Sequence, residues 1–363
     1  MRIVVAMSGG VDSSVVAGLL AQEGHEVIGV TLQLYDHGAA AKRKGACCAG
    51  EDIHDAKRVA DRLGIPHYVI DAEARFRDAV MADFAASYAT GETPVPCVRC
   101  NQSVKFGDLI AMARDLGAEA MATGHYVRRV EGPDGPELHR AVDPARDQSW
   151  FLFATTREQL AFSRFPLGAM SDKAAVRAEA ARLGLEVAVK PDSQDICFVP
   201  QGSYTEVVAK LRPEAMQPGE IVDAEGHVLG QHEGIARYTV GQAKRLGLPR
   251  REGEAAPVVT QLDPARRRVI VGPRAQGVRE VRLREVNWLA DAPAEGLRMS
   301  VKLRARAELA GARVIPLPGG AAQVLLDEPA LPAPGQGCVF YQGERVLGGG
   351  FIERPVELRA VGT

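Results

Sequence analysis

The sequence predicts an α/β fold in three parts: a parallel-sheet domain over residues 1–204, a small connector over 205–277 and a C-terminal antiparallel β-barrel over 278–363. Three observations support this fold class. Buried-type apolar runs alternate with helical periodicity in the first half, and a Gly-rich turn joins the first run to the first helix. Near residue 205 the helical periodicity fades, and short alternating runs separated by turns replace it.

The elements of the first half follow in order from these periodicities. The apolar runs predict strands at residues 3–7, 27–32, 67–71 and 120–123. Helical spacing predicts helices from residue 15 to a stop at Gly24, over 52–63 and over 104–116. In the second half, strands are predicted at 268–271 and 301–307. Such βαβ units form a mostly parallel sheet whose ligands bind at the carboxyl ends of the strands.

The segment Ser8-Gly9-Gly10-Val11-Asp12-Ser13-Ser14 lies between the first strand and the first helix. Unpaired backbone N–H groups and the helix dipole attract an anion there, and glycines allow close approach of the backbone. The segment has no Lys, so it is not a G-x-x-x-x-G-K-[ST] loop. It resembles instead the PP-loop of enzymes that cleave ATP into AMP and pyrophosphate. The alternative is an ordinary glycine-containing turn.

Charge is unevenly distributed along the chain, although the net charge is only −2. Residues 237–313 hold 17 Lys or Arg against 8 Asp or Glu, an excess of +9, so the remainder carries −11. A basic segment on an acidic chain indicates either a bound polyanion or a solvated basic face. No membrane span and no secretory signal are expected, which together with six cysteines predicts a reducing, cytoplasmic location.

Cys97 and Cys100 form a C-x-x-C motif behind Pro94 and Pro96, which predicts a rigid loop. Arg99 and Lys105 are expected to favour the thiolate forms. A zinc site would need a second such pair, and the sequence has only this one. A thioredoxin-like dithiol would open a helix after a strand, whereas this motif follows prolines. Further thiols occur at Cys47, Cys48, Cys197 and Cys338; inert burial is expected for Cys338 and for at least one of Cys47 and Cys48.

Several segments together resemble the tRNA-specific 2-thiouridylase family, PP-loop enzymes that replace oxygen by sulfur at C2 of the wobble uridine. The matching segments are residues 7–14, 47–52, 100–101, 105–106, 122–126, 147–149, 192–193, 196–198, 230–232 and 334–336. The resemblance implies a PP-loop domain of the adenine nucleotide α-hydrolase, Rossmann-like type, using ATP and Mg²⁺. It implies tRNA as substrate, the Lys, Glu and Gln acceptors among them, and a sulfur-relay or cysteine-desulfurase-derived persulfide donor protein as partner.

The resemblance also implies the roles of two cysteines. Attack of the uracil O2 on the α-phosphate would leave an adenylated base at position 34, with AMP as a good leaving group. Cys197 would carry the sulfur as a persulfide, and Cys100 would be the nucleophile that releases sulfide by forming a transient Cys100–Cys197 disulfide.

Further site residues follow from the family by position. The implied ATP-binding residues are Ala6, Met7, Ser8, Gly9, Gly10, Val11, Asp12, Ser13, Leu32 and Gly124. The implied tRNA-binding residues are His125, Asp147, Gln148, Ser149, Arg304, Arg306 and Gln336, and the implied target-base loop is Val95, Pro96 and Cys97. Alternation of Lys302, Arg304 and Arg306 on the strand predicted at 301–307 would place all three on one face as a phosphate track. Asp12 either helps to place Mg²⁺ or braces the loop.

Two departures from the family pattern affect these expectations. Many relatives carry Asn-Pro-Asp where this chain has Val95-Pro96-Cys97, and commonly a Tyr in place of Ala305. In the family, that Asp is expected to contact the target base or to move a proton. In this chain the role is therefore missing or passes to the Cys97 thiol. Cys97, Cys100 and Cys197 would also suffice as ligands of a [4Fe–4S] cluster with one open iron.

Two other functions stay open: a PP-loop ligase that adenylates a small carboxylate or carbonyl compound, and a nucleotide-gated RNA-binding protein.

Overall fold

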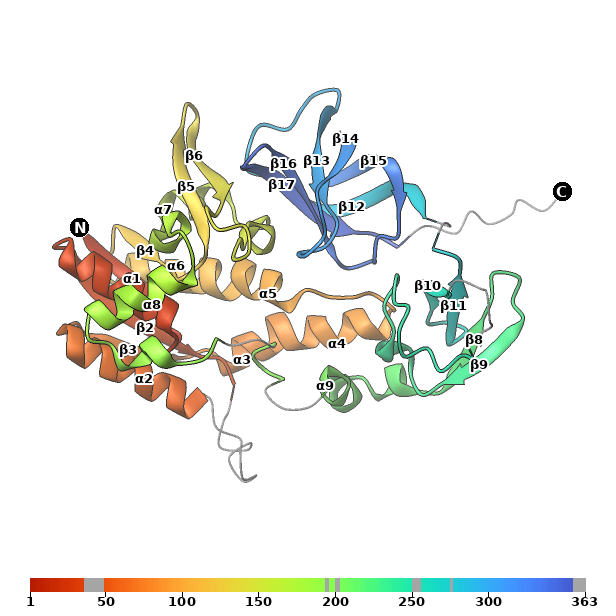
Figure 1. Cartoon of the computed structure of the whole chain (residues 1–363), viewed down its shortest axis with the longest axis horizontal. Coiled ribbons are helices and arrows are strands. Elements are labelled where there is room, and N and C mark those ends of the chain that lie inside the picture. The colour runs from red at the N-terminus through yellow and green to blue at the C-terminus, as the bar shows by residue number, and fades with distance from the viewer. Residues whose placement is uncertain (36–48, 193–195, 200–202, 250–255, 275–276, 355–363) are drawn as a thin grey trace. The chain divides into compact units, whose positions relative to one another are not determined.

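The computed structural model describes residues 1–35, 49–192, 196–199, 203–249, 256–274 and 277–354 (Figure 1). Its contacts divide the chain into two compact units, and each is described by itself. The first unit comprises Met1–Met81, Pro96–Gly202 and Gly343–Leu347, and the second comprises Ala82–Val95, Ser203–Gln342 and Gly348–Thr363. The domain limits expected at 204 and 277 stay predictions.

A five-stranded parallel sheet forms the centre of the first unit, with strand order β3-β2-β1-β4-β7. Its strands are β1 (Arg2–Ala6), β2 (Glu26–Gln33), β3 (His67–Asp71), β4 (Ala120–Ala122) and β7 (Ser163–Arg164). The four strands predicted for this region correspond to β1–β4, so the expected parallel α/β class is confirmed. An antiparallel hairpin of β5 (Val127–Gly132) and β6 (Gly135–Arg140) also belongs to this unit, and β6 pairs with Arg345 and Val346.

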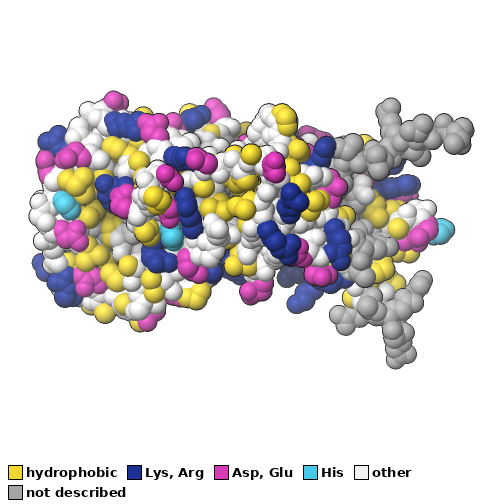
Figure 2. All heavy atoms as spheres, turned by 90° about the horizontal axis from the view of Figure 1, so that it is seen from above, with side chains coloured by type: hydrophobic (Ala, Val, Ile, Leu, Met, Phe, Trp, Pro, Cys, Tyr) yellow, Lys and Arg dark blue, Asp and Glu magenta, His cyan; other side chains and the backbone are white. Residues whose placement is uncertain are grey.

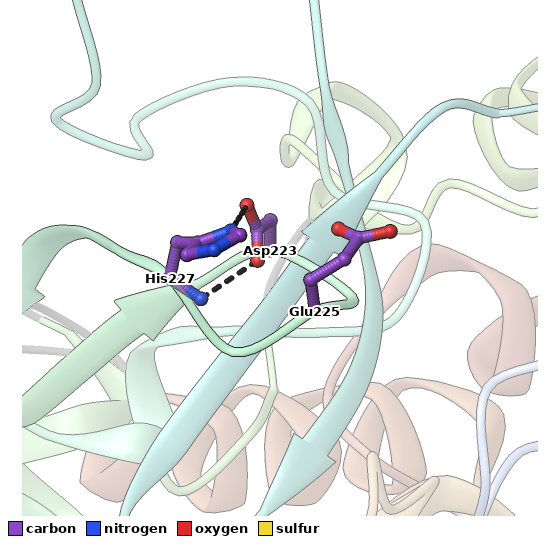
Figure 3. Close-up of side chains that lie close together, drawn as sticks. All are labelled: Asp223, Glu225 and His227. Carbon is purple, nitrogen blue, oxygen red and sulfur yellow. Dashed lines mark hydrogen bonds and ion pairs between the residues drawn. The ribbon is translucent and has the colours of Figure 1, made fainter.

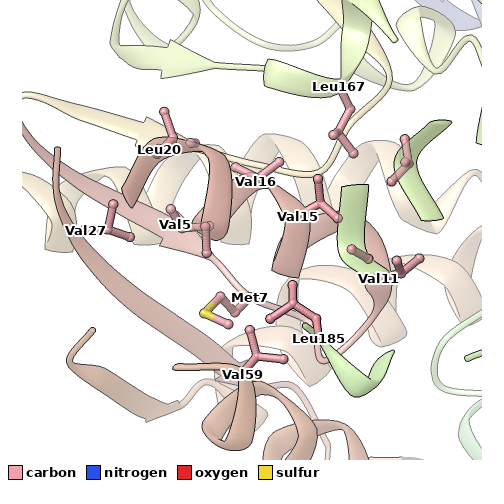
Figure 4. Packing of buried hydrophobic residues seen from close by; sticks show 14 of the residues in the cluster. Val5, Met7, Val11, Val15, Val16, Leu20, Val27, Val59, Leu167 and Leu185 are labelled. Carbon is pink, nitrogen blue, oxygen red and sulfur yellow. The ribbon is translucent and has the colours of Figure 1, made fainter. Parts of the chain in front are cut away.

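Helices and helical turns connect these strands. They are α1 (Val11–Gln22), α2 (Ala49–Leu63), α3 (Glu73–Phe76), η1 (Arg77–Met81), α5 (Pro96–Arg99), η2 (Cys100–Asp108), α6 (Leu109–Asp115), η3 (Ser149–Leu152), α7 (Arg157–Phe162), η4 (Pro166–Ala169), α8 (Lys173–Arg182) and η5 (Glu186–Val189). Alternate residues of β1 point to one face of the sheet and pack against α1, α2 and α8, because side chains alternate along a strand. Figure 4 shows Val5 and Met7 of this layer with Val15, Val16 and Val59 around them.

The C-x-x-C segment is helical, so the rigid loop expected there is wrong. The helical path begins at Pro96 rather than at residue 104 and continues through α5, η2 and α6 to Asp115. Proline fits the first turn of a helix because the N–H that it lacks would have no partner within the helix there. From Cys100 to Asp108 the hydrogen bonds take the wider π-helical register, a form often found at functional sites.

The second unit contains helices, a small sheet and a barrel. Its helices and turns are α4 (Ala82–Ala89), α9 (Tyr204–Leu211), η6 (Pro213–Met216) and η7 (Ile235–Arg237). The four-stranded sheet, in the order β10-β11-β8-β9, consists of β8 (Gly219–Val222), β9 (Val228–His232), β10 (Val258–Asp263) and β11 (Arg268–Gly272). Ile221, Leu246, Val259 and Val269 are among the residues of its own core.

A six-stranded antiparallel barrel completes the architecture, as the sequence predicts. Its order is β12-β15-β14-β13-β16-β17, and pairing of β12 with β17 closes it. The strands are β12 (Val278–Trp288), β13 (Leu297–Lys302), β14 (Ala310–Leu317), β15 (Ala321–Ala330), β16 (Gly337–Gln342) and β17 (Arg345–Ile352). The residues of β17 from Gly348 onward, which pair with β12, belong to the second unit.

The strand predicted over 301–307 is wrong in its second half. β13 ends at Lys302, and the chain then turns, with the Ala307 N–H donating to the Arg304 carbonyl at 3.1 Å. The Arg304 guanidinium instead donates to the carbonyl of Val240 at 2.6 Å. Lys302, Arg304 and Arg306 therefore do not alternate along one strand face.

The surface carries both charge signs. Figure 2 shows Lys and Arg side chains interspersed with Asp and Glu over one face of the molecule. Within the described residues, the helices are all too short or too polar to cross a membrane.

Candidate active site

The Gly-rich loop, residues 8–14, follows β1 and leads into α1. Gly9 has a φ of +73°, and a Cβ at this position would lie 2.1 Å from the Asp52 carbonyl oxygen, so only glycine fits. Gly10 precedes α1, and among the described residues no side chain caps that helix. The N–H groups of its first turn are thus suited to an anion.

Hydroxyl groups stiffen this loop from inside. Ser13 Oγ accepts a hydrogen bond from the Ser8 N–H at 3.1 Å, and Ser14 Oγ donates to the Gly10 carbonyl at 2.8 Å. Ser13 and Ser14 are buried. These hydrogen bonds tie the loop together from within.

The other residues predicted to bind ATP lie at the same edge of the sheet. Ala6 ends β1, Leu32 stands near the end of the neighbouring β2, and Gly124 follows β4 on the other side of β1. A Cβ at Gly124 would lie 2.9 Å from the Ser13 nitrogen, so the segment after β4 packs directly against the loop. Met7, directly before the loop, and Val11, the first residue of α1, are both buried.

Two lysines contact the loop from far along the chain, and the sequence analysis missed both. Lys173 Nζ lies 2.7 Å and 2.9 Å from the two carboxylate oxygens of Asp12. Lys190 Nζ donates to the Gly9 carbonyl at 3.1 Å and pairs with Asp52 at 2.6 Å. The loop has no lysine of its own, so its nearby positive charge comes through the tertiary fold. Spacing along the sequence carries no signal of such contacts.

Asp12 serves as a brace in this structure. Besides Lys173, it accepts a hydrogen bond from the Tyr126 hydroxyl at 2.6 Å. Lys173 also pairs with Asp192 at 2.8 Å, and Asp192 pairs with Arg146 at 2.7 Å. Desolvation alone would raise the pKa of Asp192, but Lys173 and Arg146 outweigh it and hold that pKa below its usual value.

Lys190 joins the loop to the beginning of α2. Its ammonium also pairs with Asp55 at 2.5 Å. Desolvation alone would lower the pKa of Lys190, yet the two carboxylates Asp52 and Asp55 raise it. Lys190 therefore stays charged at neutral pH and can hold the carbonyl of Gly9.

The three candidate cysteines Cys97, Cys100 and Cys197 all belong to the first unit. Cys97 lies on α5 with its side chain exposed, and Cys100 is buried at the start of η2. Cys197 is exposed in a turn in which the Val199 N–H donates to the Ile196 carbonyl. The adjacent Phe198 is buried and packs edge-on against Phe76 at 5.7 Å, which anchors this turn.

Electrostatic coupling links the three sulfur atoms. Desolvation raises the pKa of Cys197 to about 12, and negative charge on Cys100 and Cys97 adds to the increase. Desolvation likewise raises the pKa of Cys100, with a contribution from Cys97, while Lys105 acts in the opposite direction. The expectation that basic neighbours favour the thiolates is wrong, because desolvation outweighs Lys105 at each sulfur.

The remaining cysteines lie elsewhere. Cys338 is fully buried on β16, and burial raises its pKa, as expected of an inert thiol. Cys47 and Cys48 lie outside the described residues. Next to Cys100, the side-chain oxygen of buried Asn101 has no hydrogen-bond partner among the described residues, while its nitrogen donates to the Phe151 carbonyl at 3.1 Å.

His125 packs beside Thr123 and Phe106. It follows Gly124, its Nδ1 lies 2.8 Å from the Thr123 hydroxyl, and its ring lies 5.9 Å from that of Phe106. Desolvation, with a smaller effect of the Lys105 charge, lowers its pKa to about 3. The imidazole is therefore neutral at physiological pH. Lys105 thus influences His125 as well as all three cysteines.

The predicted tRNA-binding triplet 147–149 is used largely within the protein. The Asp147 carboxylate is 2% exposed and accepts bonds from Arg140 Nε at 3.1 Å and from the Ser149 hydroxyl at 3.0 Å. Gln148 Oε1 accepts from the Tyr126 N–H at 3.0 Å. These contacts fix the turn after β6 against the segment that carries His125.

Arg306 is exposed in the turn after β13, whereas half-buried Arg304 donates to backbone carbonyls. Gln336 donates from Nε2 to the Thr93 carbonyl at 3.0 Å. That contact supports the segment that leads to buried Val95, two residues before Cys97. Pro96 is the first residue of α5.

One group of three potential metal ligands occurs among the described residues, at the turn between β8 and β9. The ligand atoms of Asp223, Glu225 and His227 lie within 4.8 Å of one another (Figure 3). His227 Nδ1 and Asp223 are 2.9 Å apart, and the residues face solvent. The hydrogen bonds of the turn account for this arrangement, and we assign it no metal.

Comparisons with known proteins identify the family of this chain. The tRNA methyl transferase HUP domain model matches residues 1–201, the tRNA methyl transferase PRC-barrel domain model matches 206–273, and the Aminomethyltransferase beta-barrel domain model matches 278–352. The tRNA-specific 2-thiouridylase MnmA of Acidiphilium cryptum (strain JF-5) is 70% identical over 97% of this chain and 100% of its own length. The chain belongs to the tRNA-specific 2-thiouridylase family.

A second full-length relative supports this membership. The 2-thiouridylase MnmA of Gluconobacter oxydans (strain 621H) is 68% identical over 97% of this chain and 99% of its own length. Among solved structures, the NMN synthetase of Francisella tularensis matches with a TM-score of 0.33 and 18% identity, covering 58% of this chain and 76% of that one. Two of the family models carry methyl transfer in their descriptions. The full-length relatives, in contrast, are named 2-thiouridylases.

Proposed function

We propose that this chain is an ATP-dependent tRNA-uridine 2-sulfurtransferase acting on the wobble uridine at position 34. One observation carries the proposal: a single unit joins the Gly-rich loop to three thiols. Gly124 packs on Ser13 of the loop, and His125 shares the influence of Lys105 with Cys100 and Cys197. These interactions support one site for ATP activation and sulfur delivery.

The first step activates a poor leaving group. Uracil O2 attacks the α-phosphate of ATP, pyrophosphate leaves, and the base is adenylated at O2. The N–H groups at the beginning of α1 hold the phosphates, and Lys173 and Lys190 fix the loop that presents them. Mg²⁺ would be shared with the phosphates. Asp12 is the nearest carboxylate of the loop, although Lys173 and Tyr126 already engage it.

The second step exchanges sulfur for AMP. Cys197 carries the sulfur as a persulfide received from a cysteine-desulfurase-derived or relay protein. Cys100 attacks the Cys197 sulfur, hydrosulfide leaves, and a Cys100–Cys197 disulfide forms. The hydrosulfide attacks C2, and AMP departs with its electron pair. The buried position of Cys100 and the anchored turn of Cys197 keep both sulfur atoms in the unit that holds ATP.

The tRNA contacts belong to several elements. Exposed Arg306 offers a phosphate contact in the second unit, where the sequence is richest in basic residues. Asp147, Ser149 and Gln336 act by holding backbone segments in place, as their hydrogen bonds indicate. The tRNAs for Lys, Glu and Gln are the proposed substrates.

Three neighbouring thiols would also suit a [4Fe–4S] cluster with Cys97, Cys100 and Cys197 as ligands and the fourth iron open to sulfide. Iron and acid-labile sulfide analysis of anaerobically purified protein tests this route. Iron-free protein with full thiolation activity would exclude it.

Tracing ATP cleavage tests the adenylation step. With the chain, ATP and Mg²⁺, AMP and pyrophosphate should form only when unmodified tRNA is added. A nucleotide-gated RNA-binding protein would bind the tRNA without forming AMP. A small-molecule ligase would form AMP with a carboxylate and not with tRNA, and either result would contradict the proposal.

A further inference from the structure

The proposed reaction uses two thiols, but the structure holds a third in the same neighbourhood. Cys97 occupies the position where the family pattern suggests a carboxylate, and no step above requires it. Its charge acts on both Cys100 and Cys197. Cys97 therefore lies within electrostatic range of both sulfur atoms of the proposed disulfide.

Geometry singles out Cys100 as its partner. Cys97 and Cys100 are three residues apart on a continuous helical path from Pro96. Residues at this spacing have Cβ atoms about 5–6 Å apart, against roughly 4 Å across a disulfide. C-x-x-C is also the spacing of dithiol redox motifs. A small adjustment of one turn would bring the two sulfur atoms into bonding distance.

Exposure distinguishes the two thiols. Cys97 is exposed, whereas Cys100 is 6% exposed. Cys197 is exposed as well, so either disulfide presents one sulfur atom to an external reductant, but only the Cys97–Cys100 disulfide does so while leaving Cys197 free.

We propose that Cys97 is the resolving thiol of the catalytic cycle, an inference that rests on the proposed function. The Cys97 thiolate attacks Cys100 Sγ of the Cys100–Cys197 disulfide. The Cys97–Cys100 bond forms, the Cys100–Cys197 bond breaks, and Cys197 leaves with the electron pair. Cys197 takes up a proton in place of the one that Cys97 lost, so this exchange involves no net oxidation.

This exchange separates reloading from reduction. Cys197 becomes free for a new persulfide while the oxidised pair Cys97–Cys100 still awaits two electrons and two protons. A dithiol reductant of the thioredoxin type supplies these and regenerates both thiols. The protein thereby uses its exposed C-x-x-C, and not the sulfur carrier, as the entry point for reduction.

Disulfide mapping after one turnover tests the inference. The full chain is loaded with persulfide by a cysteine desulfurase and L-cysteine, desalted, and mixed with ATP, Mg²⁺ and unmodified tRNA without reductant. After acid quenching and blocking of free thiols, peptide mass spectrometry should find Cys97–Cys100 joined and Cys197 free. The variants Cys97→Ser and Cys97→Asp should shift the disulfide to Cys100–Cys197.

The aspartate variant is the sharper control, because it restores a carboxylate that could contact the base while removing the thiol. A second loading without reductant gives an independent readout: wild-type Cys197 should accept a new persulfide, and Cys97→Asp should lose this ability. Wild-type protein that retains Cys100–Cys197 with Cys97 free would overturn the inference and leave the proposed function intact. Absence of 2-thiouridine in every sample would instead reject the proposed function.

Discussion

Lys173→Met should loosen the Gly-rich loop selectively. The Lys173 side chain is 11% exposed and bridges Asp12 and Asp192 at 2.7 Å and 2.8 Å. Removal of one partner from a buried ion pair costs about 3–5 kcal/mol. Here the two carboxylates retain Tyr126 and Arg146 as partners. We therefore expect the value of one hydrogen bond to a charged group, ~2 kcal/mol.

Hydrogen exchange is the appropriate assay because the loss is local. A change of ~2 kcal/mol corresponds to roughly 30-fold faster exchange through local opening in peptides that cover residues 8–20. Lys57→Met is the matched control in the same unit: its pair with Asp61 is 2.9 Å long, with side chains 62% and 64% exposed. Such exposed pairs contribute only ~0.3–0.5 kcal/mol. Equal exchange rates at the loop in the two variants would refute the assigned bracing role of Lys173.

Three further predictions concern other parts of the chain. Gly9→Ala should abolish ATP-dependent AMP formation, because its Cβ would lie 2.1 Å from the Asp52 carbonyl oxygen; normal AMP formation would contradict the close packing. Arg306→Ala should weaken tRNA binding and flatten its salt dependence without changing thermal unfolding, because Arg306 is exposed. Arg304→Ala should also lower the unfolding temperature, because Arg304 donates a hydrogen bond to the Val240 carbonyl. Equal effects of the two variants on the unfolding temperature would contradict this distinction. Alkylation of Cys197 in the free protein should keep accelerating above pH 9, because desolvation raises its pKa to about 12, and a rate plateau near pH 8 would contradict that environment.

Ion pairs around the loop also give stability a direction with pH. The pKa of Asp192 is lowered in the folded chain. Its contribution to stability is therefore fully present above the pKa of the unfolded chain and is lost as the pH falls through the pKa of the folded chain. The pKa of Lys190 is raised, so its contribution is present below the unfolded value and is lost as the pH rises through the folded value.

Local patterns in the sequence were sufficient to predict the parallel sheet, the Gly-rich loop and the barrel. Each depends on residues adjacent in the chain, such as the glycines between β1 and α1. Lys173 and Lys190 could not be found this way, because they reach the loop through folding of a segment more than 160 residues away.

The two local errors have physical causes. Prolines before Cys97 suggested a loop, but a proline at the first helical position is compatible with a helix. Alternating basic residues after Lys302 suggested a continuing strand. Hydrogen bonds of Arg304 to Val240 and Leu331 favour a turn instead, and nothing in the alternation reports such distant acceptors.

Nucleoside mass spectrometry tests the central claim most directly. Unmodified tRNA is incubated anaerobically with the chain, ATP, Mg²⁺ and a persulfide donor, and its wobble nucleoside is then analysed. We predict 2-thiouridine at this position with wild-type protein, and none with Cys100→Ser or Cys197→Ser. Accumulation of AMP and pyrophosphate without thiolated uridine, or full thiolation by either serine variant, would contradict the account.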